Sequence, residues 1–244
     1  MDQADARTPS GAVAAVLVAT APDAGVQAAD LLWRPVAGRP LSAWPVRSLA
    51  RLDALRECAL VAPVERAEDA RRLLAAELPG LPCEVVPTPA RDWRGALALG
   101  LARISAASDW LIVLDATLPL VTTESLRAGL RAAARTGVAL AGEPVKETLK
   151  RVDGVLVVET PPRESLRRLI APLIFQRAAL ERVRGSLGDA AHAAPDARDL
   201  IALARLAGAP LTAYEAGYPG VRVTSEADLA ILETLLSQRS PEAH

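Results

Sequence analysis

The sequence predicts a single α/β domain of three layers, in which a mostly parallel sheet lies between two layers of helices. Apolar runs of strand length alternate along the chain with segments of helical spacing, which is typical of such folds. The run at 109–114, DWLIVL, is continuously apolar after its first residue and indicates a strand buried on both faces. With 244 residues, of which 51% are hydrophobic, the chain is long enough to form a substantial core.

The order of elements follows from the hydrophobic pattern. We expect strands at 12–20, 58–64, 84–87, 109–114, 138–144 and 210–217. We expect helices at 65–78, 94–105, 122–137 and 196–208, an amphipathic segment at 41–52, and a final helix that starts at a capping box of Ser225 and Asp228. The domain then spans 12–237, with residues 1–11 disordered and 238–244 frayed.

The alternation breaks between Glu143 and Pro172. The sequence RVDGVLVVETP within this stretch predicts a β-hairpin that turns at Asp153–Gly154. A segment of this kind, at about 144–170, either projects as an arm that packs on a partner subunit or covers the edge of its own sheet. Because an isolated hairpin is marginal in water, we expect a homodimer formed through the arm.

Composition excludes several classes of function. The formal net charge of -1 and the sequence pI of about 6.2 give no basic footprint for nucleic acid. No apolar run reaches membrane-spanning length, and the first residues, MDQADARTPSG, do not have the pattern of a signal peptide. We therefore expect a soluble cytoplasmic protein that binds neither nucleic acid nor membrane.

Cysteine and histidine are too scarce for most catalytic or metal motifs. Cys58 and Cys83 have no CxxC spacing and are expected to be buried, reduced thiols. His192 and His244 are the only histidines, which makes a Ser-His-Asp triad or a histidine-based zinc site improbable.

Asp115 is the most informative polar residue. It ends the apolar run at 109–114, and small residues and a proline follow it. Ligands of open α/β sheets bind just beyond the carboxyl ends of the strands, where this carboxylate could hold a metal ion on a nucleotide phosphate. The alternative is an aspartate that caps the helix starting near Thr122.

The order of six segments resembles the 2-C-methyl-D-erythritol 4-phosphate cytidylyltransferase family over about 13–237. The segments are WRPVAGRPLSAWPVRSL, GALALGLARI, LDATLPLV, EPVKETLKRV, ETPPRESL and GVRVTSEADL. The resemblance implies a Rossmann-like nucleotidyltransferase fold with a hairpin dimerisation arm. It also implies a reaction in which 2-C-methyl-D-erythritol 4-phosphate attacks the α-phosphate of CTP with Mg²⁺ and releases pyrophosphate, in isoprenoid precursor synthesis.

Most positions at which the family binds the nucleotide hold other residue types in this sequence. The family's glycine-rich phosphate loop reads ATAPDAG here, so that Thr20 and Pro22 stand where glycines belong, and Pro22 has no N–H to donate. The catalytic Pro-Lys of the family becomes Asp30–Leu31, and the arginine after its aspartate becomes Leu118. The family's nucleotide-binding positions fall on Thr20, Ala21, Arg91 and Ala96, and its aspartate on Asp115, the candidate metal ligand.

The substrate side is better kept. Thr148, Lys150 and Arg163 match the family's arm, in which the first and last positions hold the methylerythritol phosphate across the dimer interface. Arg222 replaces the lysine of the closing motif and keeps its charge but not its geometry. Without the resemblance, these residues read equally well as local hydrogen-bonding groups and solvated surface charges.

Three hypotheses follow from this pattern. The chain is an active cytidylyltransferase in which Arg34, Arg91 or Arg94 supplies the missing charge, so that Arg34 and Arg222 are the catalytic candidates. Or it is a non-catalytic paralogue that serves as a binding or regulatory subunit, pairing with an intact cytidylyltransferase. Or it transfers a nucleotide to another sugar phosphate, a reaction that would need the same glycine-rich phosphate loop that is missing here. The altered positions favour weak or lost catalysis, because each lost transition-state donor typically costs about 10²–10³ in rate.

Overall fold

The computed structural model describes residues 8–20, 30–89, 93–182, 208 and 210–237. Within this part of the chain, the centre is a seven-stranded sheet with the strand order β11-β7-β10-β6-β1-β4-β5. The strands are β1 (Val13–Val18), β4 (Leu55–Pro63), β5 (Cys83–Thr88), β6 (Trp110–Asp115), β7 (Val138–Pro144), β10 (Arg167–Gln176) and β11 (Leu211–Glu215). β10 runs antiparallel to both neighbours, and every other adjacent pair is parallel.

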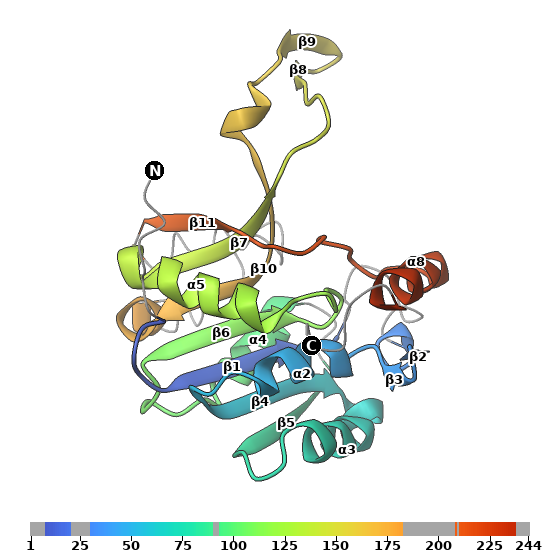
Figure 1. Ribbon diagram of the computed structural model, residues 1–244, viewed down its shortest axis with the longest axis vertical. Helices are drawn as coiled ribbons and strands as arrows, with labels where there is room; N and C mark the ends of the chain where they lie inside the picture. Colours follow the sequence, from blue (N-terminus) through green and yellow to red (C-terminus); the bar gives the residue numbers. More distant parts are fainter. Residues whose placement is uncertain (1–7, 21–29, 90–92, 183–207, 209, 238–244) are drawn as a thin grey trace.

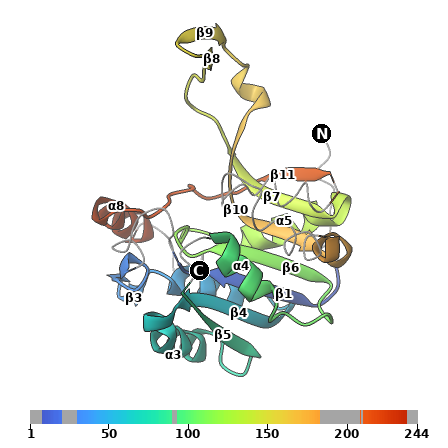
Figure 2. The same ribbon diagram turned by 180° about the vertical axis from the view of Figure 1, so that it is seen from behind.

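Helices cover both faces of the sheet and confirm the predicted three layers. α2 (Ala43–Ala50), α3 (Ala67–Glu77) and α5 (Thr123–Thr136) lie on the face seen in Figure 1, and α4 (Trp93–Leu101) lies on the face seen in Figure 2. Two separate hydrophobic clusters fill the two interfaces between sheet and helices. Every residue of β1 and β6 is buried, as expected for central strands covered on both sides.

The arm is the second prediction that the structure confirms. The chain leaves the sheet at the end of β7 and returns at the start of β10, and residues 145–166, hereafter the arm, project from the body (Figure 1). β8 (Arg151–Asp153) and β9 (Leu156–Glu159) pair at its tip, and Gly154 has the positive φ of 57° that the turn requires. A short 3₁₀ turn, η2 (Arg163–Ser165), follows. The alternative of a hairpin that covers its own sheet edge is therefore wrong.

Helix boundaries agree with their expected capping signals. Thr122 caps α5, since its hydroxyl oxygen accepts the Ser125 N–H at 3.2 Å, and Gly137 ends the helix with a φ of 88°. The alternative role of Asp115 as a cap for this helix is thereby excluded. α8 (Glu226–Ser237) begins next to Ser225, whose N–H donates to the Asp228 carboxylate at 2.8 Å, as in a capping box.

Three strands of the fold were not expected. β10 was missed because Pro172 interrupts its sequence, and the structure accommodates this proline by a register shift against β7 between Leu169 and Leu173. β2 (Pro35–Val36) and β3 (Arg39–Pro40) form a second, very short hairpin. The predicted helix at 196–208 lies almost entirely outside the described residues, as do most of both chain ends.

The two cysteines are neighbours on the sheet. Cys58 of β4 and Cys83 of β5 are register partners, and both pack on the same hydrophobic cluster. Cys58 is buried, but Cys83 is only half-buried, which corrects the expectation of two buried thiols. No helix in the described part of the chain is both long and apolar enough to cross a bilayer.

Candidate active site

The polar centre of the candidate site lies at the carboxyl end of β6. Asp115 is the last residue of that central strand, and its backbone pairs with Val18 at the end of β1. The carboxylate is almost completely buried, with 9% of the residue exposed. An ionised group at this depth requires partners, because an unpaired buried charge is strongly unfavourable.

Thr117 and Arg222 supply the partners of Asp115. Asp115 Oδ1 accepts from the backbone N–H of Thr117 at 2.9 Å and from its hydroxyl at 2.6 Å. Arg222 Nη1 donates to Asp115 Oδ2 and, at 2.6 Å, to Thr117 Oγ1. The next backbone N–H, that of Val223, donates to the carbonyl oxygen of Thr117 at 2.8 Å. Two successive residues of the closing segment, Arg222 and Val223, thus bond to residues at the end of β6 and just after it.

This arrangement brings two of the predicted site residues, Asp115 and Arg222, into direct contact although 107 residues separate them. Thr117 was not predicted. The pattern Asp-x-Thr directly after a strand was its available signal, because aspartate and threonine in loops commonly bond to backbone groups two residues away.

Arg34 is engaged elsewhere. Its Nη1 donates to Glu226 Oε1 at 2.8 Å, and both side chains are more than half exposed. The contact ties the residue before β2 to the first residue of α8. The structure therefore pairs this candidate cation with a carboxylate, which reduces the charge it can offer to a phosphate.

The positions aligned with the family's lysine and second arginine are apolar and packed. Leu31 is 5% exposed and Leu118 is 3% exposed, and both belong to the hydrophobic cluster on the α2 and α5 face. Ala96 is fully buried in α4, and Thr20 is buried just after β1. Ala21 and Arg91 lie outside the described residues, as do Pro22 and most of the loop after β1.

The three arm candidates are exposed and lie away from the body of the fold (Figure 1). Lys150 Nζ donates to Thr160 Oγ1 at 2.7 Å across the arm. Arg163 forms an ion pair with Glu164 at 3.5 Å in η2, and the Thr148 side chain faces solvent. Within one chain the structure does not bring these residues to Asp115.

A hollow lies where the arm joins the body. It has a volume of about 560 Å³, and its walls come from three segments: the end of β7 with the first arm residues, the start of β10, and residues 219–221 just before Arg222. Its charged lining is mixed, with Lys146, Arg167 and Arg168 beside Glu143 and Glu147. An apolar part comes from Leu149 and Val221. The hollow therefore adjoins the segment that carries Arg222.

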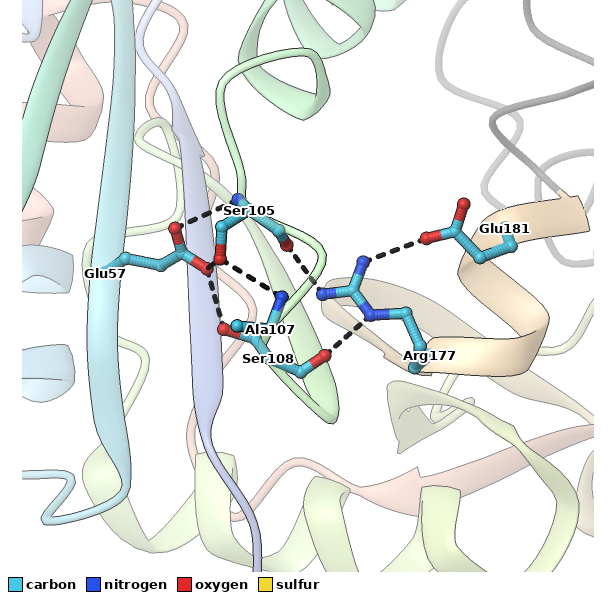
Figure 3. Close-up of polar contacts among 6 residues, drawn as sticks. All are labelled: Glu57, Ser105, Ala107, Ser108, Arg177 and Glu181. Atoms are coloured by element: carbon cyan, nitrogen blue, oxygen red, sulfur yellow. Dashed lines mark hydrogen bonds and ion pairs between the residues drawn. The ribbon is translucent and has the colours of Figure 1, made fainter.

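A second polar cluster lies near the amino ends of β4 and β6, whereas Asp115 stands at the carboxyl end of β6 (Figure 3). The Glu57 carboxylate of β4 accepts from the Ser105 N–H at 3.0 Å, from the Ser105 hydroxyl at 2.9 Å and from the Ser108 hydroxyl at 2.7 Å. Arg177, just after β10, donates to the carbonyl oxygens of Ser105 and Ser108 and pairs with Glu181. These contacts hold the loop between α4 and β6 and have the features of a structural cluster.

The chemistry of a metal at Asp115 can be assessed from its donor set. Among the described residues there is no group of three or more His, Cys, Asp or Glu side chains that could enclose an ion. Mg²⁺ often takes only one or two carboxylates and completes its shell with waters and substrate phosphates. Asp115 Oδ2 already accepts from Arg222, so an ion bound here would share the carboxylate with the guanidinium. It would need the nucleotide phosphates both as its other ligands and to offset the charge of Arg222.

The fold, together with the candidate site at the carboxyl end of β6, defines the class of protein. It is a protein with the Rossmann-like nucleotidyltransferase fold and a projecting hairpin arm. The chain belongs to the IspD, or 2-C-methyl-D-erythritol 4-phosphate cytidylyltransferase, family, whose model matches residues 13–238. This match confirms the resemblance that the six segments indicate.

Individual relatives are distant. The chain is 25% identical over 227 residues to a 2-C-methyl-D-erythritol 4-phosphate cytidylyltransferase of Dehalococcoides mccartyi, covering 93% of this chain and 96% of the relative. It is 33% identical over 209 residues to a bifunctional enzyme IspD/IspF of Anaeromyxobacter, covering 84% of this chain and 52% of the relative. The chain spans between half and two thirds of the length of several curated relatives that it matches.

Solved structures support the fold. A 4-diphosphocytidyl-2C-methyl-D-erythritol synthase from Anaerococcus prevotii superposes with a TM-score of 0.79 at 16% identity, over 96% of this chain and all of that chain. A 2-C-methyl-D-erythritol 4-phosphate cytidylyltransferase from Thermus thermophilus gives a TM-score of 0.64 at 23% identity, over 91% of this chain and 98% of that chain.

Proposed function

We propose that this protein is a cytidylyltransferase-like protein with weak or lost catalysis, which binds a sugar-alcohol phosphate, 2-C-methyl-D-erythritol 4-phosphate, at the Asp115 site. The observation that carries the proposal is the contrast within one site. Arg222 is a cation held in place by hydrogen bonds to Asp115 and Thr117. The position that aligns with the family's lysine holds a buried leucine instead.

The Arg222 guanidinium suits a phosphate ligand. Its Nη1 is fixed on Asp115 and Thr117, and the planar group carries further N–H donors that can bind phosphate oxygens in pairs. The side chain is 29% exposed, so a ligand can reach it. Asp115 serves to orient this cation and to keep it in place before the ligand arrives, which is preorganisation in the usual sense.

Mg²⁺ would enter this site with the triphosphate of CTP. Asp115 is the residue that would contact it, and the ion would supply neutralisation of the charge on the phosphates. Nucleotidyl transfer depends mainly on positioning and on such neutralisation, because the protein has little covalent chemistry to perform.

The rate is expected to be low because several donors are altered together. Leu31 and Leu118 offer neither charge nor hydrogen bond, and the loop after β1 contains Pro22 in a position where the family places a glycine. Losses of this kind are not additive, but each alone costs about 10²–10³ in rate.

Pyrophosphate release in the presence of CTP, Mg²⁺ and 2-C-methyl-D-erythritol 4-phosphate tests the proposal. We expect turnover far below the values of about 1 s⁻¹ or more that are usual for enzymes. Ligand-induced thermal shifts, measured for CTP, UTP, ATP and the sugar phosphate separately, show which half of the site binds. Turnover at the usual rate, or no stabilisation by the sugar phosphate, would contradict the proposal.

A second candidate function is that of a non-catalytic subunit which lends its arm to an intact cytidylyltransferase. The observation that favours it is the exposure of Thr148, Lys150 and Arg163 on an arm that extends beyond its own body. Co-expression with an intact enzyme should yield a mixed dimer, and Arg163→Ala in this chain should slow the partner's turnover. Arg151→Ala is the matched control, because it removes another exposed arm arginine, which pairs with Glu159 and not with the residues of η2. Failure to co-purify excludes this function.

A further inference from the structure

Two charged residues connect the base of the arm with the segment that carries Arg222, and this pair is hereafter called the bracket. Glu143, near the end of β7, and Arg168, near the start of β10, are register partners at the base of the arm and form an ion pair. Both stand on the strands from which the arm projects.

The pair holds one backbone unit of the closing segment. Glu143 Oε2 accepts from the Gly220 N–H at 3.1 Å, and Arg168 Nη2 donates to the Gly220 carbonyl oxygen at 3.3 Å. Both polar groups of Gly220 are thereby satisfied by one carboxylate and one guanidinium. Gly220 lies two residues before Arg222 in the sequence.

Gly220 approaches the sheet too closely for a side chain. A Cβ atom built on it would stand 2.9 Å from Ile170 Cγ2 and 3.3 Å from Arg168 Nη2. The segment 219–221 also borders the hollow at the arm base. The bracket and this close approach set where Gly220 lies, together with the packing of Tyr218, Val221 and Val223 on the hydrophobic cluster.

Arg222 is consequently held from two directions. The bracket fixes the backbone before it, and the bond from the Val223 N–H to the Thr117 carbonyl fixes the backbone after it. We propose that Glu143 and Arg168 are positioning residues, which act through Gly220 to aim the Arg222 guanidinium at Asp115 and the phosphate site, and which couple the arm to that site. This inference rests on the proposed function in that Arg222 contacts the substrate phosphate.

The pair is not needed to explain stability. The Arg168 side chain is 57% exposed and that of Glu143 is 24% exposed, and ion pairs with an exposed partner typically contribute little to stability. A role in positioning predicts instead a loss of ligand affinity with little change in the free energy of unfolding.

The experiment compares Glu143→Ala with Glu143→Gln in the full chain. Glutamine keeps an oxygen that can accept the Gly220 N–H, whereas alanine removes it. We expect alanine to raise the Kd for 2-C-methyl-D-erythritol 4-phosphate about five- to tenfold and glutamine to raise it about twofold or less. Glu159→Ala is the matched control, because it breaks an arm ion pair with Arg151 that is distant from Gly220.

Hydrogen exchange gives a readout that does not require the ligand. In Glu143→Ala the amide of Gly220 and the peptide spanning 219–223 should exchange faster, while peptides of β6 and α5 keep their rates. Unchanged exchange there, or wild-type affinity in Glu143→Ala, overturns the positioning role. If the wild type does not bind the sugar phosphate, the proposed function fails, and exchange alone then decides whether the bracket positions the Arg222 segment.

Discussion

At the scale of single residues, the surroundings of Leu31 determine whether a lysine at this position could take the role of the family's lysine. Its side chain is packed in the core among other apolar groups. The position aligned with the family's lysine therefore faces the interior in this chain, and the neighbouring Asp30 is bound to Arg66. The leucine at this position therefore contributes to the hydrophobic core, and a lysine side chain here would point into it.

We expect Leu31→Lys to leave pyrophosphate release unchanged and to lower the free energy of unfolding by about 2–5 kcal/mol, because it buries an amine without a partner. Leu31→Met, which keeps volume and polarity, should cost less than about 1.5 kcal/mol and serves as the control. Urea titration measures the stability. A gain in pyrophosphate release of about a hundredfold or more would show that the side chain can reach the triphosphate.

Glu57 provides a residue whose ionisation supports the fold. Burial raises its pKa, but the hydrogen bonds from Ser105 and Ser108 and the charge of Arg177 outweigh that effect, so the pKa lies below its usual value. A carboxyl group with a lowered pKa in the folded state contributes stability above its unfolded pKa. That contribution is lost as the pH falls through the folded pKa.

Glu57→Gln should therefore destabilise the protein by about 1–3 kcal/mol at neutral pH, and the difference from the wild type should shrink as the pH is lowered below about 4. Urea titrations at a series of pH values measure this. Glu84→Gln is the control, because Glu84 lies on β5 and forms an exposed ion pair with Arg103. This change should cost less than about 1 kcal/mol. A difference that does not depend on pH would exclude the ionised form of Glu57 as its source.

The contact of Asp115 with Arg222 shows which part of the site a sequence can reveal. Asp115 was predicted because a buried apolar strand ended in it, which is a local signal. Arg222 was assigned only through the family's closing motif, and no spacing rule connects two residues so far apart in the chain. Thr117 and the Glu143–Arg168 bracket were missed, since a threonine in a loop and a charge at a strand end have bland local explanations.

At the scale of elements, small residues let two helices approach the sheet on its opposite faces. Gly100 of α4 lies against Val16 and Val61, and Gly129 of α5 lies against Ile174 and Tyr214. A Cβ atom at either position would stand within 3 Å of buried side-chain atoms. Close packing of this kind fixes how deep each helix sits on the strands that lead to the site.

Gly129→Ala tests this packing. In a free helix the change favours helix formation by about 1 kcal/mol, but here the new methyl group would stand 2.4 Å from Ile174 Cδ1, and Ile174 is fully buried. We expect a net loss of about 1–3 kcal/mol by urea titration. Ala134→Gly at an exposed position of α5 measures helix propensity alone. Stabilisation by Gly129→Ala would mean that the helix can shift away from the sheet without cost.

Element prediction succeeded where the hydrophobic period was regular and failed where the backbone was irregular. β1, β6 and α5 follow long, clear patterns and agree with their predicted ranges to within a few residues. β10 contains Pro172, which cannot donate to a ladder, and so its pattern argues against a strand although the register shift makes room for it. The β2–β3 hairpin is too short for any periodicity to be seen.

At the scale of the whole molecule, the arm carries apolar residues that a single chain leaves exposed to water. Its apolar residues are exposed, with Val155 at 95%, Leu156 at 68% and Val157 at 62%. A two-stranded hairpin alone is marginally stable, and an exposed apolar patch usually marks an interaction surface. A second copy related by a two-fold axis would cover both arms at once, which is why we expect a homodimer.

Light scattering at micromolar concentration should give twice the chain mass of 25.6 kDa. Replacing Leu156 and Val157 together by serine should shift the protein toward the monomer, because the interface loses apolar contact area at about 25 cal/mol per Å². Val64→Ser is the matched control, since Val64 is also exposed, at 57%, but lies in η1 (Val64–Arg66), outside the arm. A monomeric wild type, or equal dissociation by the control, would show that the arm does not join two copies and that its apolar residues are covered in another way.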